Sequence, residues 1–123
     1  MKTRRNSDAD APRVTRGSGN VFTDLGFSAD RAEELQLKAE LARQIYLRIK
    51  ALRLTQVQAS RRLGISQPDV SKLMNARFTG YSTDRLIVLL NALGIDVDIV
   101  LRPRDPDRSG VAGIVRVKRS AAA

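Results

Sequence analysis

The sequence contains no cysteine and no histidine among its 123 residues. Without cysteine there is no disulfide framework and no thiolate chemistry. Without histidine the commonest general base and metal ligand is missing, and the two absences together remove the usual ligands of a structural zinc site. The sequence also offers no nucleophile–base pair and no glycine-rich phosphate loop. We therefore expect no enzymatic activity, no metal and no other cofactor.

Aromatic residues and long apolar runs are also scarce. Aromatic residues make up 4% of the chain and hydrophobic residues 42%, so the core is expected to be aliphatic. No apolar run approaches the roughly 20 residues of a membrane-spanning helix. The first 19 residues lack the apolar centre of a signal peptide. These features predict a cytoplasmic protein that does not enter a membrane, with one domain and tails.

Positive charge is abundant and unevenly placed. The formal net charge is +9, and between Arg43 and Arg77 eight cations accompany a single acid, Asp69. The neighbouring segments 28–42 and 78–102 each carry a net negative charge. A basic block between acidic segments favours a surface that binds a polyanion. The alternative is a solvated basic face with no partner.

The basic block contains the signals of two short helices. The sequence TQVQ from Thr55 is a capping box, in which a threonine cap is followed three residues later by glutamine. Gly64 is suited to end that helix in a left-handed conformation. Ser66 caps the next helix, and Pro68 lies in its first turn, where its missing N–H needs no partner. Two capped helices at this spacing predict a helix-turn-helix unit.

Further elements flank this unit. Apolar residues at three- and four-residue spacing predict a helix over 28–52, begun by Ser28, and a leucine-rich helix over 82–93. Residues 95–101 alternate between apolar and acidic or exposed positions, which predicts a strand closed by Pro103, and 113–118 is a candidate second strand. The apolar segment 20–27 is expected either to pack on the core as a strap or to bind a partner.

The predicted fold is mainly α, a bundle of about four to five helices with a short C-terminal β-strand. Residues 1–19 are expected to form a disordered basic tail, because they are polar and rich in Ser, Gly and Arg. Residues 20–102 form the helix-turn-helix domain with its strand. Residues 103–123 are expected to be a flexible basic tail that includes the candidate second strand.

The second helix of the pair has one apolar side and one polar side. At 100° per residue, Val70, Leu73 and Met74 group together, and Pro68, Lys72 and Asn75 fall opposite them. Ser71 and Asp69 lie on the two edges of the polar side. A helix-turn-helix places its second helix in the major groove of DNA, so Lys72 and Asn75 are the central candidates for contacts with bases or phosphates.

The segment QVQASRRLGISQPDVSKL, from Gln56 to Leu73, resembles the helix-turn-helix of Cro/C1-type (XRE) repressors, which have a lambda-repressor-like fold. The packing set that carries the resemblance is Ala59, Ser60, Leu63, Gly64, Ile65, Val70 and Leu73. Ser60 departs from the alanine that this family prefers. The resemblance implies a protein of the nucleoid that binds double-stranded DNA at an operator, with Gln56 on a phosphate and Gln67, Ser71, Lys72 and Asn75 close to the bases.

The full set of candidate DNA-binding residues is Arg53, Thr55, Gln56, Arg61, Ser66, Gln67, Pro68, Ser71, Lys72, Asn75 and Arg77, and Arg62 is a further candidate for a phosphate contact. Asp69 has two interpretations: its carboxylate accepts amide hydrogen bonds at the start of the helix, or it accepts from a cytosine amine. Tyr46 and Tyr81 are expected to pack at the core or its rim, with base stacking as the alternative.

The flanks GNVFTDLGF, AEELQLKAELARQI and LLNALGIDVDIVLRPR resemble the HigA-type antitoxins of bacterial toxin–antitoxin modules. This resemblance implies a homodimer that represses its own operon at a palindromic operator and neutralises a RelE/HigB-like toxin. The apolar residues of 82–101 are the expected dimer interface. The alternatives are a stand-alone XRE-family regulator without a toxin, and an interaction module or enzyme that uses the unit as a scaffold.

Overall fold

The structure is a computed structural model of the whole chain, and it describes residues 20–108 and 114–120. The N-terminal tail expected at 1–19 lies outside the described residues. The chain divides into two compact units whose boundary falls within one long helix, between Gln36 and Leu37. Each unit is described by itself.

The first unit begins with a single helical turn, α1 (Val21–Asp24). The Asn20 side chain caps it by accepting from the backbone N–H of Phe22 at 2.9 Å, and the Asn20 Nδ2 group donates to the carbonyl oxygen of Ala32 at 3.0 Å. Phe22 and Phe27 meet edge to face with ring centroids 6.2 Å apart. Val21, Leu25 and Phe27 nevertheless remain 55%, 69% and 44% exposed, so much of the apolar surface of this segment stays accessible within its unit.

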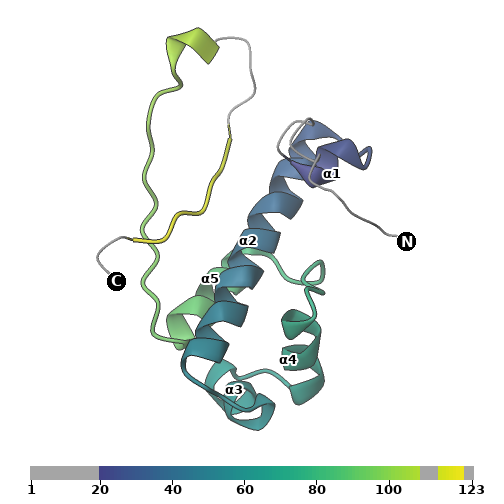
Figure 1. Cartoon of the computed structure of the whole chain (residues 1–123), viewed down its shortest axis with the longest axis vertical. Helices are drawn as coiled ribbons and strands as arrows, with labels where there is room; N and C mark the ends of the chain where they lie inside the picture. Colours follow the sequence, from purple (N-terminus) through teal and green to yellow (C-terminus); the bar gives the residue numbers. More distant parts are fainter. Residues whose placement is uncertain (1–19, 109–113, 121–123) are drawn as a thin grey trace. The chain divides into compact units, whose positions relative to one another are not determined.

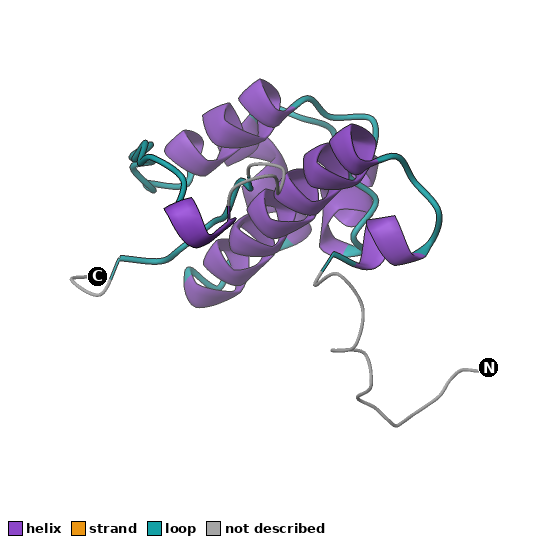
Figure 2. Cartoon of the chain, turned by 90° about the horizontal axis from the view of Figure 1, so that it is seen from above, coloured by secondary structure: helices purple, strands orange, loops and turns teal. Residues whose placement is uncertain are grey.

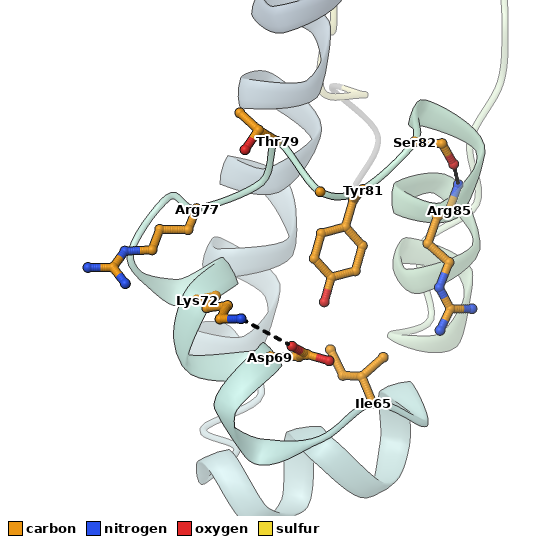
Figure 3. A pocket seen from close by; sticks show the side chains of 9 residues that line it. Ile65, Asp69, Lys72, Arg77, Thr79, Tyr81, Ser82 and Arg85 are labelled. Atoms are coloured by element: carbon orange, nitrogen blue, oxygen red, sulfur yellow. Dashed lines mark hydrogen bonds and ion pairs between the residues drawn. The ribbon is translucent and has the colours of Figure 1, made fainter.

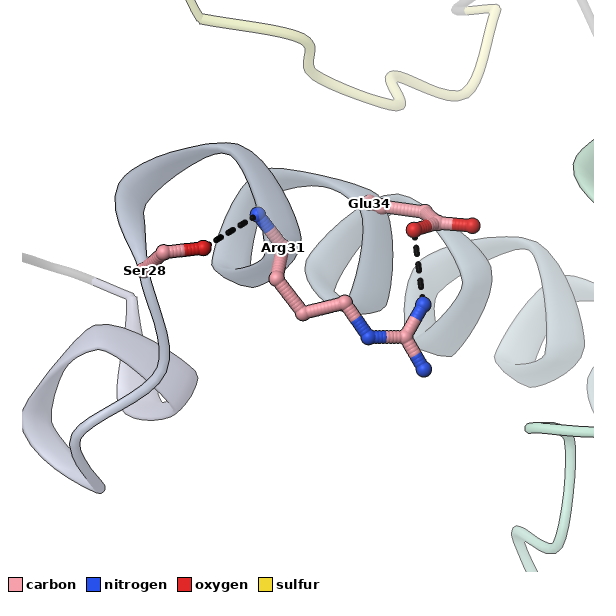
Figure 4. Close-up of polar contacts among 3 residues, drawn as sticks. All are labelled: Ser28, Arg31 and Glu34. Atoms are coloured by element: carbon pink, nitrogen blue, oxygen red, sulfur yellow. Dashed lines mark hydrogen bonds and ion pairs between the residues drawn. The ribbon is translucent and has the colours of Figure 1, made fainter.

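The long helix α2 (Ala29–Ala51) begins where the sequence predicts. The Ser28 hydroxyl accepts from the N–H of Arg31 at 3.3 Å, and Arg31 pairs with Glu34 at 2.6 Å one turn further on (Figure 4). The predicted apolar stripe is buried at four of its positions, which are Leu35, Ala42, Ile45 and Ile49.

The second unit holds the rest of α2 and three shorter helices, α3 (Gln56–Leu63), α4 (Gln67–Met74) and α5 (Thr83–Ala92). Figure 1 shows α3 and α4 joined by a short turn. Both α4 and α5 pack against α3. Their buried side chains form an aliphatic core that consists of Leu41, Ala42, Ile45, Ile49, Ala59, Leu63, Val70, Leu73, Leu86, Leu89, Leu90 and Leu93, with Phe78 added from the loop after α4.

The four longer helices are each followed by a residue with left-handed backbone. These residues are Arg53 (φ 56°), Gly64 (φ 70°), Ala76 (φ 62°) and Gly94 (φ 82°). In each case the following N–H bonds back across the last turn, as from Leu54 to the Ile49 carbonyl at 3.1 Å. Gly64 and Gly94 confirm the predicted helix ends, because glycine has no Cβ to oppose this conformation.

The predicted C-terminal strand is not formed. Within the described residues the structure contains only helices and loops (Figure 2), and residues 95–105 have no regular structure. The side chains of Ile99, Val100 and Leu101 are 75%, 82% and 88% exposed. The alternating pattern therefore lacks what a strand requires, a second backbone to accept and donate its hydrogen bonds.

The region after this segment also differs from its prediction. Residues Pro106–Arg108 form one turn of 3-10 helix, η2. The described part of the second candidate strand, 114–118, has no regular structure, although the N–H of Val117 donates to the Glu40 carboxylate on α2 at 2.9 Å.

Candidate nucleic-acid interface

The start of α3 is fixed by the predicted capping box. Thr55 Oγ1 accepts from the N–H of Gln58 at 3.1 Å, and the Gln58 side chain accepts from the N–H of Thr55 at 2.9 Å. Both hydrogen bonds satisfy amides that a helix start leaves without partners. Gln56 is the first residue of the helix and is exposed, so its side chain is accessible to a ligand at this end.

The turn between the two helices explains why serine is accepted at position 60. Gly64 and Ile65 both donate their N–H groups to the Ser60 carbonyl, at 2.9 and 3.2 Å. The Ser60 hydroxyl in turn donates to the carbonyl oxygen of Ile65. Ala59 beside it is fully buried. The hydroxyl therefore satisfies a turn carbonyl that alanine would leave to another donor.

The second helix of the unit, α4, is capped by Ser66, whose hydroxyl accepts from the N–H of Asp69 at 3.2 Å. Pro68 lies in the first turn, as predicted. Val70 and Leu73 are buried to 0% and 2% exposure, which docks α4 through one face. The opposite face is thereby presented outward, as the angular count predicts.

The predicted base-contacting residues lie on or near this outward face. Gln67, Lys72 and Asn75 are exposed, and Ser71 is half-buried. Asn75 ends α4, and its amide donates to the Ser71 carbonyl at 2.8 Å, which leaves its side-chain oxygen available. Arg77 follows α4 and is also exposed. The structure thus gathers the predicted set around one short helix.

The arginines of the basic block divide into two groups. Arg53 and Arg61 are exposed, with Arg53 in the left-handed turn between α2 and α3. Arg62 instead donates through Nε to the Ala92 carbonyl at 3.1 Å, and Arg48 donates to the Leu93 carbonyl at 2.9 Å. These two cations therefore hold the C-terminal end of α5, where the helix dipole favours positive charge.

A pocket opens beside α4, between that helix, the loop after it and the start of α5 (Figure 3). Its lining includes Asp69, Lys72, Arg77, Tyr81 and Arg85. The Tyr81 ring reaches into the pocket with its hydroxyl toward Asp69. Partial burial and the Asp69 carboxylate raise the pKa of the Tyr81 hydroxyl, and Arg85 opposes that rise. The pocket therefore combines three cations with one acid and one phenol.

Known proteins resemble the chain over most of its length. A family model described as "Helix-turn-helix domain" matches residues 21–102. The chain belongs to this helix-turn-helix family. A solved structure described as that of a "Putative XRE Family Transcriptional Regulator" shares 46% sequence identity, with a TM-score of 0.67, and the match covers 73% of this chain and 99% of that one. Curated proteins include no significant match to this sequence.

At this level of identity, the chain is an XRE-family regulator, and the resemblance of Gln56–Leu73 to that family is confirmed. None of its helices in the described ranges is long and apolar enough to cross a membrane.

The XRE-family chain also has features that the sequence did not predict. Tyr81, Thr79 and Arg85 line the pocket beside α4, although they come from outside the motif. The Ser82 cap, which accepts from the N–H of Arg85 at 3.1 Å, fixes where α5 begins, but the place of that helix beside α4 depends on tertiary packing.

Proposed function

We propose that this XRE-family regulator binds double-stranded operator DNA in a sequence-specific manner and represses transcription. The observation that carries the proposal is the arrangement of α4. Val70 and Leu73 dock one face of this helix on the core, and Lys72 and Asn75 are exposed on the opposite face. A helix of this kind enters the major groove and places side-chain donors against the base edges. Gln67 and Ser71 belong to the same base-contacting set.

We assign the remaining candidate residues either to contacts with the DNA phosphates or to the caps that position the two helices. Gln56, Arg53, Arg61 and Arg77 are exposed around the two helices, and we assign them to phosphates. Thr55, Ser66 and Pro68 set the two helix starts, where uncompensated N–H groups also favour phosphate.

We further propose a homodimer on a palindromic operator, formed through residues 82–101. Support comes from apolar side chains that the single chain leaves exposed, since Val88 on α5 is 53% exposed and Ile99 to Leu101 are at least 75% exposed. Backbone pairing of two copies of the 95–101 segment would also supply the partner that this predicted strand lacks. Two helix-turn-helix units related by a two-fold axis would then meet two half-sites.

The antitoxin role is a separate proposal, in which the protein neutralises a RelE/HigB-like toxin and represses its own operon. It is supported by the resemblance of the flanks and by the exposed apolar side chains around α1, where Val21 and Leu25 are 55% and 69% exposed. A stand-alone regulator fits the fold equally well. Purification after co-expression with the neighbouring genes separates the two, because only the antitoxin should retain a small basic protein through a high-salt wash.

The DNA-binding proposal is tested by selecting a binding site from random duplexes and measuring affinity by fluorescence anisotropy. Lys72→Ala and Asn75→Ala should each weaken specific binding by about 1–3 kcal/mol, the value of one side-chain pairing with a base edge. Lys118→Ala is a matched control, because it removes the same charge from an exposed residue far along the chain. Affinity should fall steeply with salt. Unchanged affinity in both α4 variants would exclude the assignment of α4 as the recognition helix.

A further inference from the structure

Asp69 is the one acid in the basic block, and it lies in the first turn of α4. Its backbone N–H donates to the Ser66 hydroxyl. Among the described residues no amide donates back to the carboxylate, in contrast to the reciprocal pair of Thr55 and Gln58 on α3. Its one ionic contact there is with Lys72, at 4.0 Å between Oδ1 and Nζ. The interpretation of Asp69 as a reciprocal capping residue therefore finds no support.

The Asp69 carboxylate instead faces the pocket beside α4. Its side chain is 43% exposed, so it is open to a ligand. Figure 3 shows it between Lys72 and the hydroxyl of Tyr81. Arg77 and Arg85 line the same pocket. The three cations attract a polyanion such as DNA, and the Asp69 carboxylate would then lie against it.

On DNA a carboxylate has few possible partners. Phosphates and the guanine and thymine edges in the major groove present acceptors, which repel it. The donors available there are the amino groups of cytosine (N4) and adenine (N6). An acid on the DNA-facing surface therefore opposes binding to most sequences and favours those that place an amino group against it.

The combination of an acceptor, Asp69, with a donor, Lys72, narrows the choice to one base pair. The two side chains offer an acceptor and a donor 4.0 Å apart. In a C·G pair the cytosine N4 donor and the guanine O6 acceptor are joined by their own hydrogen bond, so they lie about 2.9 Å apart. Guanine adds N7 as a second acceptor for lysine. An A·T pair with adenine toward Asp69 offers only the thymine O4, beside a methyl group, and the two reversed pairs place an acceptor against the acid.

We propose that Asp69 and Lys72 together read one C·G base pair, with Asp69 accepting from the cytosine N4 amine and Lys72 donating to guanine O6 and N7. This inference rests on the proposed DNA-binding function and specifies which base the site selects. Asp69 acts in two ways, by accepting from the cytosine amine and by repelling the acceptors of guanine, thymine and the phosphates. Lys72 alone would favour guanine without excluding phosphate or thymine contacts.

The decisive variant is Asp69→Asn, because asparagine has nearly the same shape but pairs with adenine through N6 and N7. Site selection from random duplexes should give wild-type half-sites with one position that prefers cytosine by about 5- to 150-fold, the range that corresponds to 1–3 kcal/mol. In Asp69→Asn the preference at that position alone should change to adenine. Affinity for unrelated duplexes should rise, because the repulsive charge is gone.

Two further variants provide the controls. Asp84→Asn removes an exposed acid from the first turn of α5, which is also capped by serine; its selected site should equal that of the wild type. Lys72→Met should weaken the preference at the same base pair as Asp69→Asn, because the two residues share it. Thermal unfolding of each variant, followed by circular dichroism, checks that the fold persists.

The outcomes separate this inference from the function on which it rests. If Asp69→Asn selects the wild-type site at every position, including after a loss of thermal stability, Asp69 has only a structural role and the inference is overturned. An unchanged preference for cytosine combined with changes elsewhere would overturn it too. If the wild-type protein selects no site at all, the proposed function itself fails.

Discussion

Two adjacent segments of this chain, α5 and residues 95–101, have similar apolar content but differ in burial. In α5 the side chains of Leu86 and Leu89 are fully buried, whereas Ile99 to Leu101 in the next segment are at least 75% exposed. A helix satisfies its backbone within itself, but a strand depends on hydrogen bonds from another segment. The comparison shows that an apolar pattern specifies the preferred backbone, while burial also requires a partner.

The largest expected effect comes from replacing one leucine in each segment, a buried one in α5 and an exposed one in 95–101. Leu89→Ala should lower the free energy of unfolding by about 2–5 kcal/mol, because it opens a cavity in a closed core. Leu101→Ala should change it by less than about 0.5 kcal/mol at low protein concentration, because its side chain is already 88% exposed. Urea unfolding measures both.

Repeating that measurement over a range of protein concentrations tests the proposed homodimer. In a dimer the destabilisation by Leu101→Ala should grow with concentration, whereas that by Leu89→Ala should not depend on it in the same way. Equal destabilisation by the two variants at low concentration would mean that residue 101 is buried within the single chain, against the comparison.

The next effect concerns helix capping, a local interaction that stabilises a helix without a second segment. Ser66→Ala should cost about 1 kcal/mol, because the N–H of Asp69 loses the hydroxyl that accepts from it. Ser66→Asn should retain most of the stability, since asparagine caps as well as serine. If both variants are equally destabilised in thermal unfolding, the effect does not come from the cap.

A smaller gain in stability is expected where helices end in left-handed backbone without glycine. Ala76→Gly should stabilise the protein by about 0.5–1 kcal/mol, because the Cβ at φ 62° is strained. Arg53→Gly, at φ 56°, should gain a similar amount but should also remove one phosphate contact, which reduces the salt slope of operator binding by about one. An unchanged salt slope would leave Arg53 as a turn residue only.

Features fixed by neighbouring residues could be predicted from the sequence, whereas features that depend on a second segment could not. The caps Thr55 and Ser66 and the stop at Gly64 were predictable because each acts on its own neighbours within one turn. The buried face of α4 followed from the helical period. The strand predicted over 95–101 is not formed within the described residues of the single chain, and nothing within that segment states whether a second strand exists.

For the candidate site, likewise, the positions within α4 could be predicted from the sequence, but contacts with distant residues could not. Lys72 and Asn75 are exposed on the side of α4 where the angular count places them, but the roles of Arg48 and Arg62 at the end of α5 depend on contacts 45 and 30 residues away. Tyr81 and Arg85 entered the pocket through the packing of α5, which no local pattern records. The capping role of Asp69 was a reasonable local inference that the geometry of the carboxylate does not support.

The smallest effect concerns how the C-terminal region is held, and hydrogen exchange measures it. Amides inside α4 and α5 should exchange only on global unfolding, whereas those of residues 96–104, whose backbone has no hydrogen bond to another segment in the described part of the chain, should exchange at nearly the unprotected rate. The Val117 amide is intermediate, because its acceptor is the Glu40 side chain. Glu40→Ala should therefore speed exchange at Val117, with global stability within about 0.5 kcal/mol. Strong protection of 96–104 at low protein concentration would show that this segment has a partner within the single chain, and the contrast with α5 would then not hold.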